Sequence, residues 1–310
     1  MKNQLASKIR AAFQSRTSHS RTSAYRRGLY AMLLPYALFS FILVVLPVLT
    51  SLGLSFFSYD AISPPIRNGL RNFVDVLSDP LLGTAIFNSL FFIVLAVPLR
   101  LLGALLLALL LNHPRTGTGL FRAAVYIPTV IPDVAYALIA LWIFNPLYGP
   151  LNQFLKLLHL PAPAWLTDPT TAKLAIVLMS LLQIGEGFVL LLAGLKDIPK
   201  DYYDAAAVDG CGRRLAFRHI TLPFLQPWLV LLAFRDVILS FQNTFVPAYI
   251  MTGGGPYYGT FFLPMMIYEE AFDRFRFGTG SVLMLFMFLL TLGLLLLLYR
   301  LFKGWGHDEA

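Results

Sequence analysis

Long apolar stretches, separated by shorter polar segments, dominate the pattern of this chain. A helix needs roughly 20 apolar residues, at about 1.5 Å of rise per residue, to cross the hydrocarbon core of a bilayer. Six stretches meet this length, at residues 29–57, 86–111, 123–144, 172–195, 222–251 and 280–302. The pattern therefore predicts an all-α fold: a polytopic membrane protein with six transmembrane helices.

The composition agrees with a membrane protein. Of 310 residues, 57% are hydrophobic and only 13% are charged, whereas a soluble domain averages about 25% charged residues. The net charge of +8 does not indicate nucleic acid as a partner, because the basic residues flank apolar stretches and no nucleic-acid-binding motif is present. Cys211 is the single cysteine, which excludes an intrachain disulfide, and we expect it to be a small packing residue.

The positions of lysine and arginine predict the orientation in the membrane. With the N-terminus inside, the inner segments hold 16 of these residues and the outer segments hold 6. The six outer ones are Arg67, Arg71, Lys156, Lys173, Arg274 and Arg276. Because cytoplasmic segments carry the excess of positive charge, both termini are predicted to be cytoplasmic.

These spans divide the chain into segments. Residues 1–28 contain seven lysines and arginines and no acid, so we expect a cytoplasmic arm attracted to anionic membrane lipid. A first transmembrane helix at 29–57 and an external loop at 58–85 follow. A core with five transmembrane helices occupies 86–302, and 303–310 form a cytoplasmic tail.

The most polar segment inside the core is the cytoplasmic loop at 196–221, which lies between the fourth and fifth spans. Its first part, 199–208, predicts a short helix, because Pro199 and Asp201 suit the first turn and three alanines follow. Gly210 and Gly212 are expected to end that helix. A second helical start, with Phe217 and Ile220 on one face, then leads into the fifth span.

The same loop resembles the "EAA" loop of importer-type ABC transporter permeases, E-A-A-x-x-D-G-A-x-x-x-x-x-F-x-x-I-x-L-P. The residues that match it are Ala205, Ala206, Asp209, Gly210, Phe217, Ile220, Leu222 and Pro223. Asp204 stands where the pattern has glutamate, and Cys211 stands where it has alanine. Asp204 keeps the charge but reaches one methylene less far.

A second stretch narrows the resemblance. Thr252-Gly-Gly-Gly-Pro256, followed by Ile267-Tyr268 and Ala271-Phe272, is similar to the T-x-G-G-P … I-Y-x-x-A-F stretch of carbohydrate-uptake permeases, especially the MalF/UgpA-like subunit. Thr279-Gly-Ser281 departs from the alanine-rich sequence that is usual there. The resemblance extends from about residue 28 to the end of the chain.

The resemblance implies a fold, partners and a mechanism. The fold would be that of an ABC importer type I permease (MetI-like), in the bacterial cytoplasmic (inner) membrane. The implied partners are a second related permease subunit, two ATP-binding subunits and an extracytoplasmic sugar-binding protein. The helix that begins the EAA-like loop would dock on an ATPase subunit, with Asp204 meeting a basic group. Arg213, Arg214 and Arg218 would contact either that ATPase or membrane phospholipid.

Polar residues within the spans are the other candidates for function, because a charge at the centre of a bilayer costs about 2.5–3.5 kcal/mol on insertion scales. Arg100 lies in the second span, and Gln183 and Glu186 share one face of the fourth. Arg235, Asp236, Gln242 and Asn243 lie in the fifth span. A translocation pathway for sugars could be lined by polar side chains that bind hydroxyls. The candidates are Glu186, Arg235, Asp236, Gln242 and Asn243. Alternatively, the carboxylates could neutralise Arg100 or Arg235 between packed helices. We expect Asp133, which follows Pro132, to cap a helix.

No catalytic constellation is visible. The chain has no G-x-x-x-x-G-K-[ST] motif, and its five histidines are scattered without metal-ligand spacing. We therefore expect no enzyme activity, metal or cofactor in this chain, with ATP and Mg bound by the partner ATPase subunits. The cargo would be a sugar, glycerol-phosphate or another polar solute. An alternative from a different class is an ion-coupled secondary transporter that uses Glu186 and Asp236. A membrane scaffold without transport is a third possibility, and the polar residues within the spans argue against it.

Overall fold

The structure is a computed structural model that describes residues 28–113 and 115–303. Most of the predicted arm at 1–28 and of the predicted tail at 303–310 therefore lies outside the described residues. Helices make up nearly all of the regular structure, and a hairpin of two short strands, β1 (Phe57–Ser58) and β2 (Ile66–Arg67), is the exception in the described part. The all-α prediction is thus confirmed.

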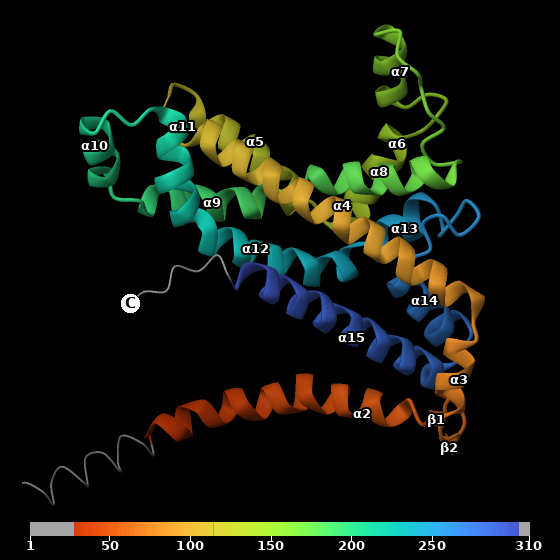
Figure 1. The fold of residues 1–310 in the computed structure, drawn as a ribbon. Coiled ribbons are helices and arrows are strands. Elements are labelled where there is room, and N and C mark those ends of the chain that lie inside the picture. Colours follow the sequence, from red (N-terminus) through yellow and green to blue (C-terminus); the bar gives the residue numbers. More distant parts are fainter. Residues whose placement is uncertain (1–27, 114, 304–310) are drawn as a thin grey trace, which may run out of the picture.

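Four helices in the described part are long and apolar enough to cross a membrane: Gly28–Leu54, Pro80–Leu111, Arg213–Met251 and Phe277–Phe302. Two further spans are bent pairs of helices, so the predicted number of six is reached when each pair counts as one span. The long helices run between two ends of the molecule (Figure 1). We call these the α10 end, which carries α10 (Lys200–Val208), and the α3 end, which carries α3 (Arg71–Leu77) and the hairpin.

The third predicted span, 123–144, is not one helix. It consists of α5 (Thr118–Val130) and α6 (Asp133–Ile143), whose axes differ by 104°. Pro132 explains the break, because proline disfavours helical geometry at the residue before it, and Ile131 is extended with ψ 128°. The prediction for Asp133 was also wrong: it is the first residue of α6, and its side chain makes no capping hydrogen bond.

The fourth predicted span, 172–195, is also divided. It consists of α8 (Pro169–Leu181) and α9 (Gly185–Asp197), bent by 43° at the break between them. Gly185 and Gly187 lie at the start of α9, and closely spaced glycines are a common cause of kinks because only proline favours the helix less.

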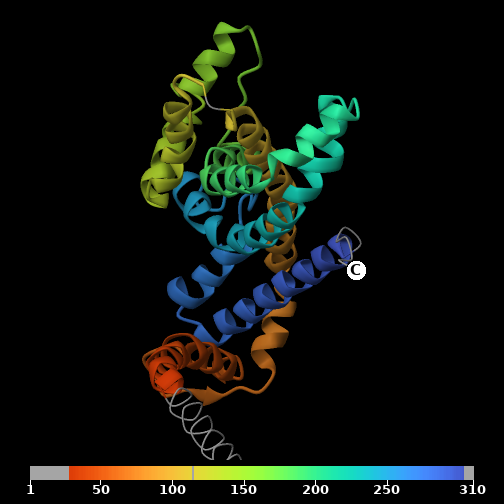
Figure 2. The ribbon, with the colours of Figure 1, turned by 90° about the vertical axis from the view of Figure 1, so that its left-hand side faces the viewer.

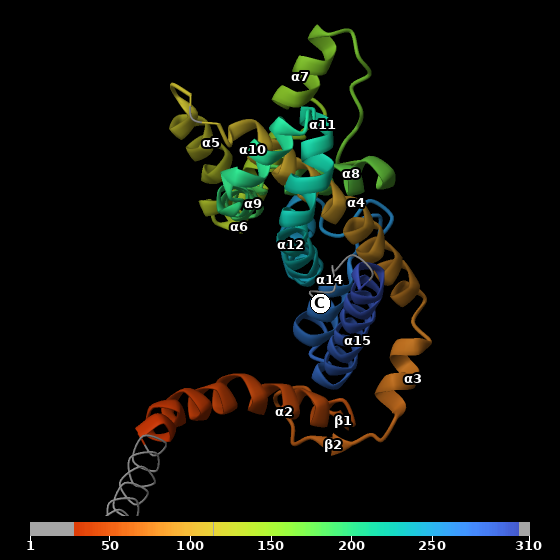
Figure 3. The ribbon, with the colours of Figure 1, turned by 60° about the vertical axis from the view of Figure 1, so that its left-hand side comes forward.

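The first span stands apart from the other helices. It ends at Leu54, three residues before the predicted end, and has no buried residue in its final segments η1 (Phe41–Val45) and α2 (Leu46–Leu54). It approaches α15 (Phe277–Phe302) near the α3 end and diverges from it toward the other end (Figures 1 and 3). The Ser51 and Ser281 hydroxyls, 3.4 Å apart, mark this point of contact.

The second span is longer than predicted. Helix α4 (Pro80–Leu111) begins six residues before the expected start, because Asp79 caps it by accepting a hydrogen bond from the N–H of Leu81 at 2.8 Å. The segment 58–85, predicted as an external loop, therefore contains the hairpin, α3 and the first turns of α4. Buried Asn72 ties this region together by donating to the carbonyls of Ser55 and Phe57, both at 2.9 Å.

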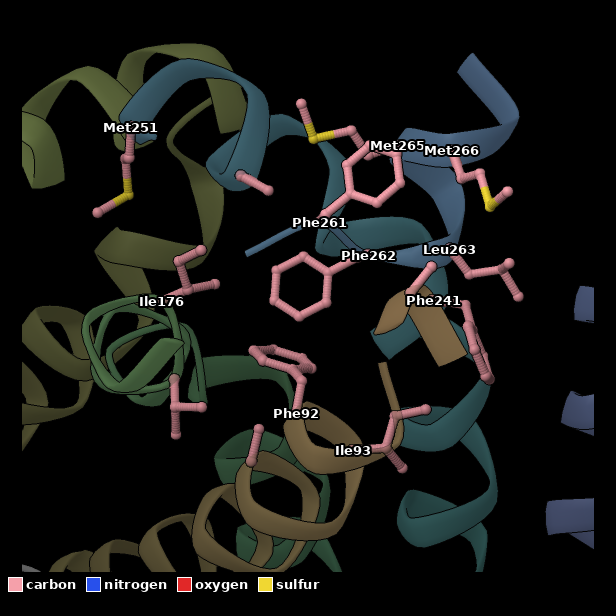
Figure 4. Packing of buried hydrophobic residues seen from close by; sticks show 14 of the residues in the cluster. Phe92, Ile93, Ile176, Phe241, Met251, Phe261, Phe262, Leu263, Met265 and Met266 are labelled. Atoms are coloured by element: carbon pink, nitrogen blue, oxygen red, sulfur yellow. The ribbon is translucent and has the colours of Figure 1, made fainter. Parts of the chain in front are cut away.

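Two clusters of buried apolar side chains hold the helices together. The larger cluster lies toward the α3 end, where Phe92 of α4 packs against Phe262 and Phe241 of α12 (Leu222–Asn243) belongs to the same cluster (Figure 4). The smaller cluster lies toward the α10 end, where Ala104 and Phe188 join α4 to α9. Helix α13 (Phe245–Met251) and helix α14 (Leu263–Tyr268) complete the larger cluster.

One helix projects outward from the larger cluster, against which its Leu151 packs. Helix α7 (Pro150–Leu157) lies at one extreme of the molecule, and the first span lies at the opposite extreme (Figure 2). Asn152 fixes the base of this projection: its side chain donates to the carbonyl of Pro163 at 2.9 Å and accepts from the Trp165 indole at 2.8 Å.

Candidate functional site

A cavity of about 300 Å³ lies between α4, α5, α9 and α12. It forms where the two apolar clusters meet, since on α4 the polar residue Arg100 separates Val97 of the larger cluster from Ala104 of the smaller one. The residues that line it are Arg100, Leu101, Ala104, Thr129, Asp133, Gln183, Ile184, Glu186, Gly187, Leu232, Arg235, Asp236, Leu239 and Asn243. Its volume is at the lower end of the range that is usual for small-molecule sites.

Arg100 and Asp236 form the buried side of this cavity. The Arg100 Nε lies 3.3 Å from an Asp236 carboxylate oxygen, and their side chains are only 9% and 14% exposed. Arg100 also donates from Nη2 to the Ser240 hydroxyl at 2.5 Å, and that hydroxyl donates to the carbonyl of Asp236 at 2.6 Å. The guanidinium of Arg100 is thus held by α12 through one charged and one neutral partner.

Arg235 joins α12 to α9 on the more open side of the cavity. Its guanidinium pairs with the Glu186 carboxylate and lies 3.8 Å from the Asp236 carboxylate. Glu186 and Arg235 are 49% and 35% exposed, so water screens this pair more than it screens the Arg100–Asp236 pair. The charged residues therefore line the cavity and also neutralise one another, and their role in a translocation pathway stays a prediction.

Three polar side chains of the lining have no ion pair or hydrogen bond to another described residue: those of Asp133, Gln183 and Asn243. They come from α6, from the break between α8 and α9, and from α12, and they leave carboxylate and amide groups free to bind a solute. Gln242, predicted together with Asn243 to line the pathway, is exposed and is not part of the lining. Asp133 was predicted only as a helix cap, and the sharp turn at Pro132 brings it to the cavity.

The EAA-like loop forms two helices joined by a tight turn. Helix α10 confirms the predicted short helix, and it has no buried residue. Gly210 has φ +76°, a left-handed conformation that glycine adopts without strain. The N–H groups of Gly210 and Cys211 donate to the carbonyls of Ala207 and Ala206, at 3.1 Å and 2.8 Å, which is the Schellman arrangement that ends helices.

The segment after the turn is continuous with the fifth span. It runs from α11 (Arg213–Ala216) through the π-helical segment η2 (Phe217–Thr221) into α12. Helix α10 is tied to this segment by a hydrogen bond between the Tyr203 and Thr221 hydroxyls, 2.8 Å apart. Of the predicted loop residues, Asp204, Ala205, Asp209 and Gly210 are exposed, whereas Ala206, Cys211, Phe217, Ile220, Leu222 and Pro223 are half-buried.

The loop and the cavity are connected by the same two helices. Helix α9 runs from Glu186 at the cavity to the residues just before α10, and α12 returns from the loop to Arg235 and Asp236. They pack closely at Gly194, where an added Cβ would lie 2.8 Å from two atoms of the Trp228 indole. A displacement of α10 would therefore reach the cavity along two packed helices.

No group of three or more histidine, cysteine, aspartate or glutamate side chains in the described residues could hold a metal ion. The site as a whole is a polar, ion-paired cavity within a helical membrane protein. Helices α9 and α12 connect it to the exposed loop that contains the short helices α10 and α11. These features define a polytopic transport component.

The chain belongs to the family described as binding-protein-dependent transport system inner membrane components, whose match covers residues 100–304. It is 34% identical over 264 residues to the sulfoquinovosyl glycerol transport system permease protein SmoG of Agrobacterium fabrum, covering 84% of this chain and 85% of that one. It is 32% identical over 266 residues to the trehalose/maltose transport system permease protein MalF of Thermococcus litoralis, covering 85% and 89%.

A solved structure of a bacterial alginate ABC transporter, in complex with an alginate-pentasaccharide-bound periplasmic protein, includes a chain of similar fold. The TM-score is 0.77, with 22% sequence identity and coverage of 89% of this chain and 94% of that chain. The fold prediction, an importer permease with a MetI-like arrangement of helices, is confirmed. Membership of this family places the chain in the inner membrane as a multi-pass protein.

Proposed function

We propose that this chain is a membrane-spanning subunit of an ATP-driven importer for a sugar or a related polar solute. In this assembly it forms the translocation pathway with a second, related permease. Two ATP-binding subunits, which bind ATP and Mg, act on the EAA-like loop, and an extracytoplasmic binding protein delivers the solute. The α10 end is cytoplasmic and the α3 end is external, as the distribution of lysine and arginine indicates.

One observation carries this proposal: the exposed helix α10 lies in the connection that joins α9 to α12 along the chain. These two helices supply Glu186, Arg235 and Asp236 to the cavity. When the ATPase subunits close on ATP, a push on α10 moves α9 and α12 together, and the cavity changes its access from one side of the membrane to the other. Small residues, Ala205 and Ala206, allow a partner to approach the helix closely, and exposed Asp204 provides a charge for that contact.

The names of two relatives support a sugar or a sugar derivative as the cargo of this importer. The two relatives above are named for transport of sulfoquinovosyl glycerol and of trehalose or maltose. The lining agrees with such solutes, because carboxylate, amide and guanidinium groups make directional hydrogen bonds to hydroxyls. An ion-coupled secondary transporter is less well supported, since Glu186 and Asp236 both pair with arginines and are not free to carry an ion.

Reconstitution tests the assembly. The complete complex in liposomes is expected to take up solute only when ATP is present on the α10 side and the binding protein on the other side. The chain alone, under an imposed proton or sodium gradient, is expected to move none. Uptake by the chain alone under such a gradient would favour the secondary transporter instead.

The single cysteine provides a test of orientation that does not need the cargo. Cys211 is half-buried beside the turn at Gly210, so a membrane-impermeant maleimide should reach it from one side only. We expect labelling of the chain, expressed without ATPase subunits, in inside-out vesicles and not in right-side-out vesicles. A Cys211→Ala chain measures the background. Labelling confined to right-side-out vesicles would reverse the orientation and refute the proposed contact with cytoplasmic ATPases.

A further inference from the structure

The charges of the cavity lining are not balanced. Of the described residues that line it, two are arginines, Arg100 and Arg235, and three are carboxylates, Asp133, Glu186 and Asp236. The lining therefore carries a net charge of −1. The sign matters because a low-dielectric, concave surface concentrates the field of its charges and so repels solutes of the same sign.

The arginines are also not free to receive an anion. Arg100 is buried against Asp236 and the Ser240 hydroxyl, and Arg235 pairs with Glu186 and lies next to Asp236. A phosphate, sulfonate or carboxylate that approached either guanidinium would compete with the carboxylate already paired with it. Displacing that carboxylate would leave it without its partner, which is costly when the group is buried.

Asp133 is the carboxylate that remains unpaired. Its side chain has no hydrogen bond or ion pair to another described residue, and it is an exposed residue at the wall of the cavity. An ionised carboxylate only accepts hydrogen bonds, and its two oxygens can accept from neighbouring hydroxyls of a polyol. Gln183 and Asn243 add amide groups that both donate and accept.

Helix α9 points its N-terminal end at the cavity, and such an end attracts anions through its partial positive charge. Here Glu186 lies in the first turn of that helix and occupies this position with its own negative charge. The helix end therefore does not provide an anion site either.

From these observations we propose that the cavity selects neutral, hydroxyl-rich solutes over anionic ones, and that Asp133 is the residue that sets this preference. The inference rests on the proposed function and narrows it. It separates this chain from the similar structure named for alginate, an acidic polysaccharide, and from the relative named for sulfoquinovosyl glycerol, whose sulfonate group is an anion.

The test measures the sign of the potential in the cavity without knowledge of the cargo. In the assembled complex, Cys211→Ala removes the native thiol and Leu239→Cys places one in the lining. Three methanethiosulfonate reagents are compared: neutral hydroxyethyl, anionic sulfonatoethyl and cationic trimethylammonioethyl. Each labelling rate is divided by the rate of the same reagent with free 2-mercaptoethanol. We expect the anionic reagent to react about tenfold or more slowly than the neutral one.

Two variants assign the effect to Asp133. Asp133→Asn is expected to reduce the difference between the neutral and anionic reagents, and Asp133→Lys is expected to reverse it. Asp273→Asn, the same change at an exposed aspartate outside the lining, should leave the ratio unchanged. An anionic reagent that reacts as fast as the neutral one, or a ratio unaffected by Asp133→Lys, would overturn the inference. Failure of all three reagents to react would instead contradict an open pathway, and so the proposed function.

Discussion

Replacing Gly210 with proline is expected to abolish ATP-driven uptake while the chain still inserts in the membrane. Proline fixes φ near −65°, and Gly210 requires +76°. The substitution also removes the N–H that donates to the carbonyl of Ala207. Because proline cannot adopt the native backbone conformation here, the substitution destabilises the turn that orients α10. Uptake by the reconstituted complex, with membrane content measured by immunoblot, checks this result.

Gly212 provides the matched control for that experiment. It has φ −72°, and an added Cβ would meet no atom within 4 Å. Gly212→Ala should therefore transport like the unmodified chain.

Asp204→Lys is the complementary variant, because it keeps the turn and reverses a single exposed charge. We expect it to stop uptake as well. Normal uptake in both Gly210→Pro and Asp204→Lys would show that this loop does not couple the ATPase subunits to transport.

Replacing Asp236 with alanine is expected to destabilise the protein more than any other change in the cavity. It leaves the Arg100 guanidinium, which is 9% exposed, without the carboxylate that neutralises it. Loss of one partner of a buried ion pair costs about 3–5 kcal/mol. We expect a lower Tm and a smaller yield of the solubilised complex, measured by thermal unfolding and by size-exclusion chromatography.

The neighbouring ion pair supplies the comparison. Glu186→Ala also removes a carboxylate that pairs with an arginine, but Arg235 keeps its contact with Asp236 at 3.8 Å. The lost pair is also more accessible to water, since Glu186 is 49% exposed and Arg235 is 35% exposed. Such pairs contribute about 1 kcal/mol or less, so this variant should fold normally. Replacing both Arg100 and Asp236 with leucine should restore much of the Tm, because it removes both buried charges. Equal Tm values for Asp236→Ala and Glu186→Ala would show that burial does not distinguish the two pairs.

The sequence predicted the helical segments well, because a span must be long and apolar whatever its neighbours are. It did not predict the 104° bend between α5 and α6, since Pro132 could equally have kinked one continuous span. The early start of α4 depended on Asp79, whose capping role is a matter of local geometry. The short helix at 199–208 and its end at Gly210 were predictable, because glycine and alanine act through local conformation.

The site was only partly predictable. Periodicity placed Gln183 and Glu186 on one face, but the partner of Arg235 is decided by the packing of α9 on α12. The Arg100–Asp236 pair joins residues 136 positions apart, and no local pattern distinguishes it from other combinations. Asp133 reaches the cavity through a turn that the hydrophobic pattern did not reveal.

The break between α8 and α9 has a consequence for hydration. Helix α9 begins at Gly185, so the N–H groups of its first turn have no partner within the helix. Glu186 and Gly187 of that turn line the cavity, and lipid offers no group that could accept their hydrogen bonds. Water in the cavity would accept these hydrogen bonds when no solute is bound. A solute that enters would then have to replace this water with hydrogen-bond acceptors of its own.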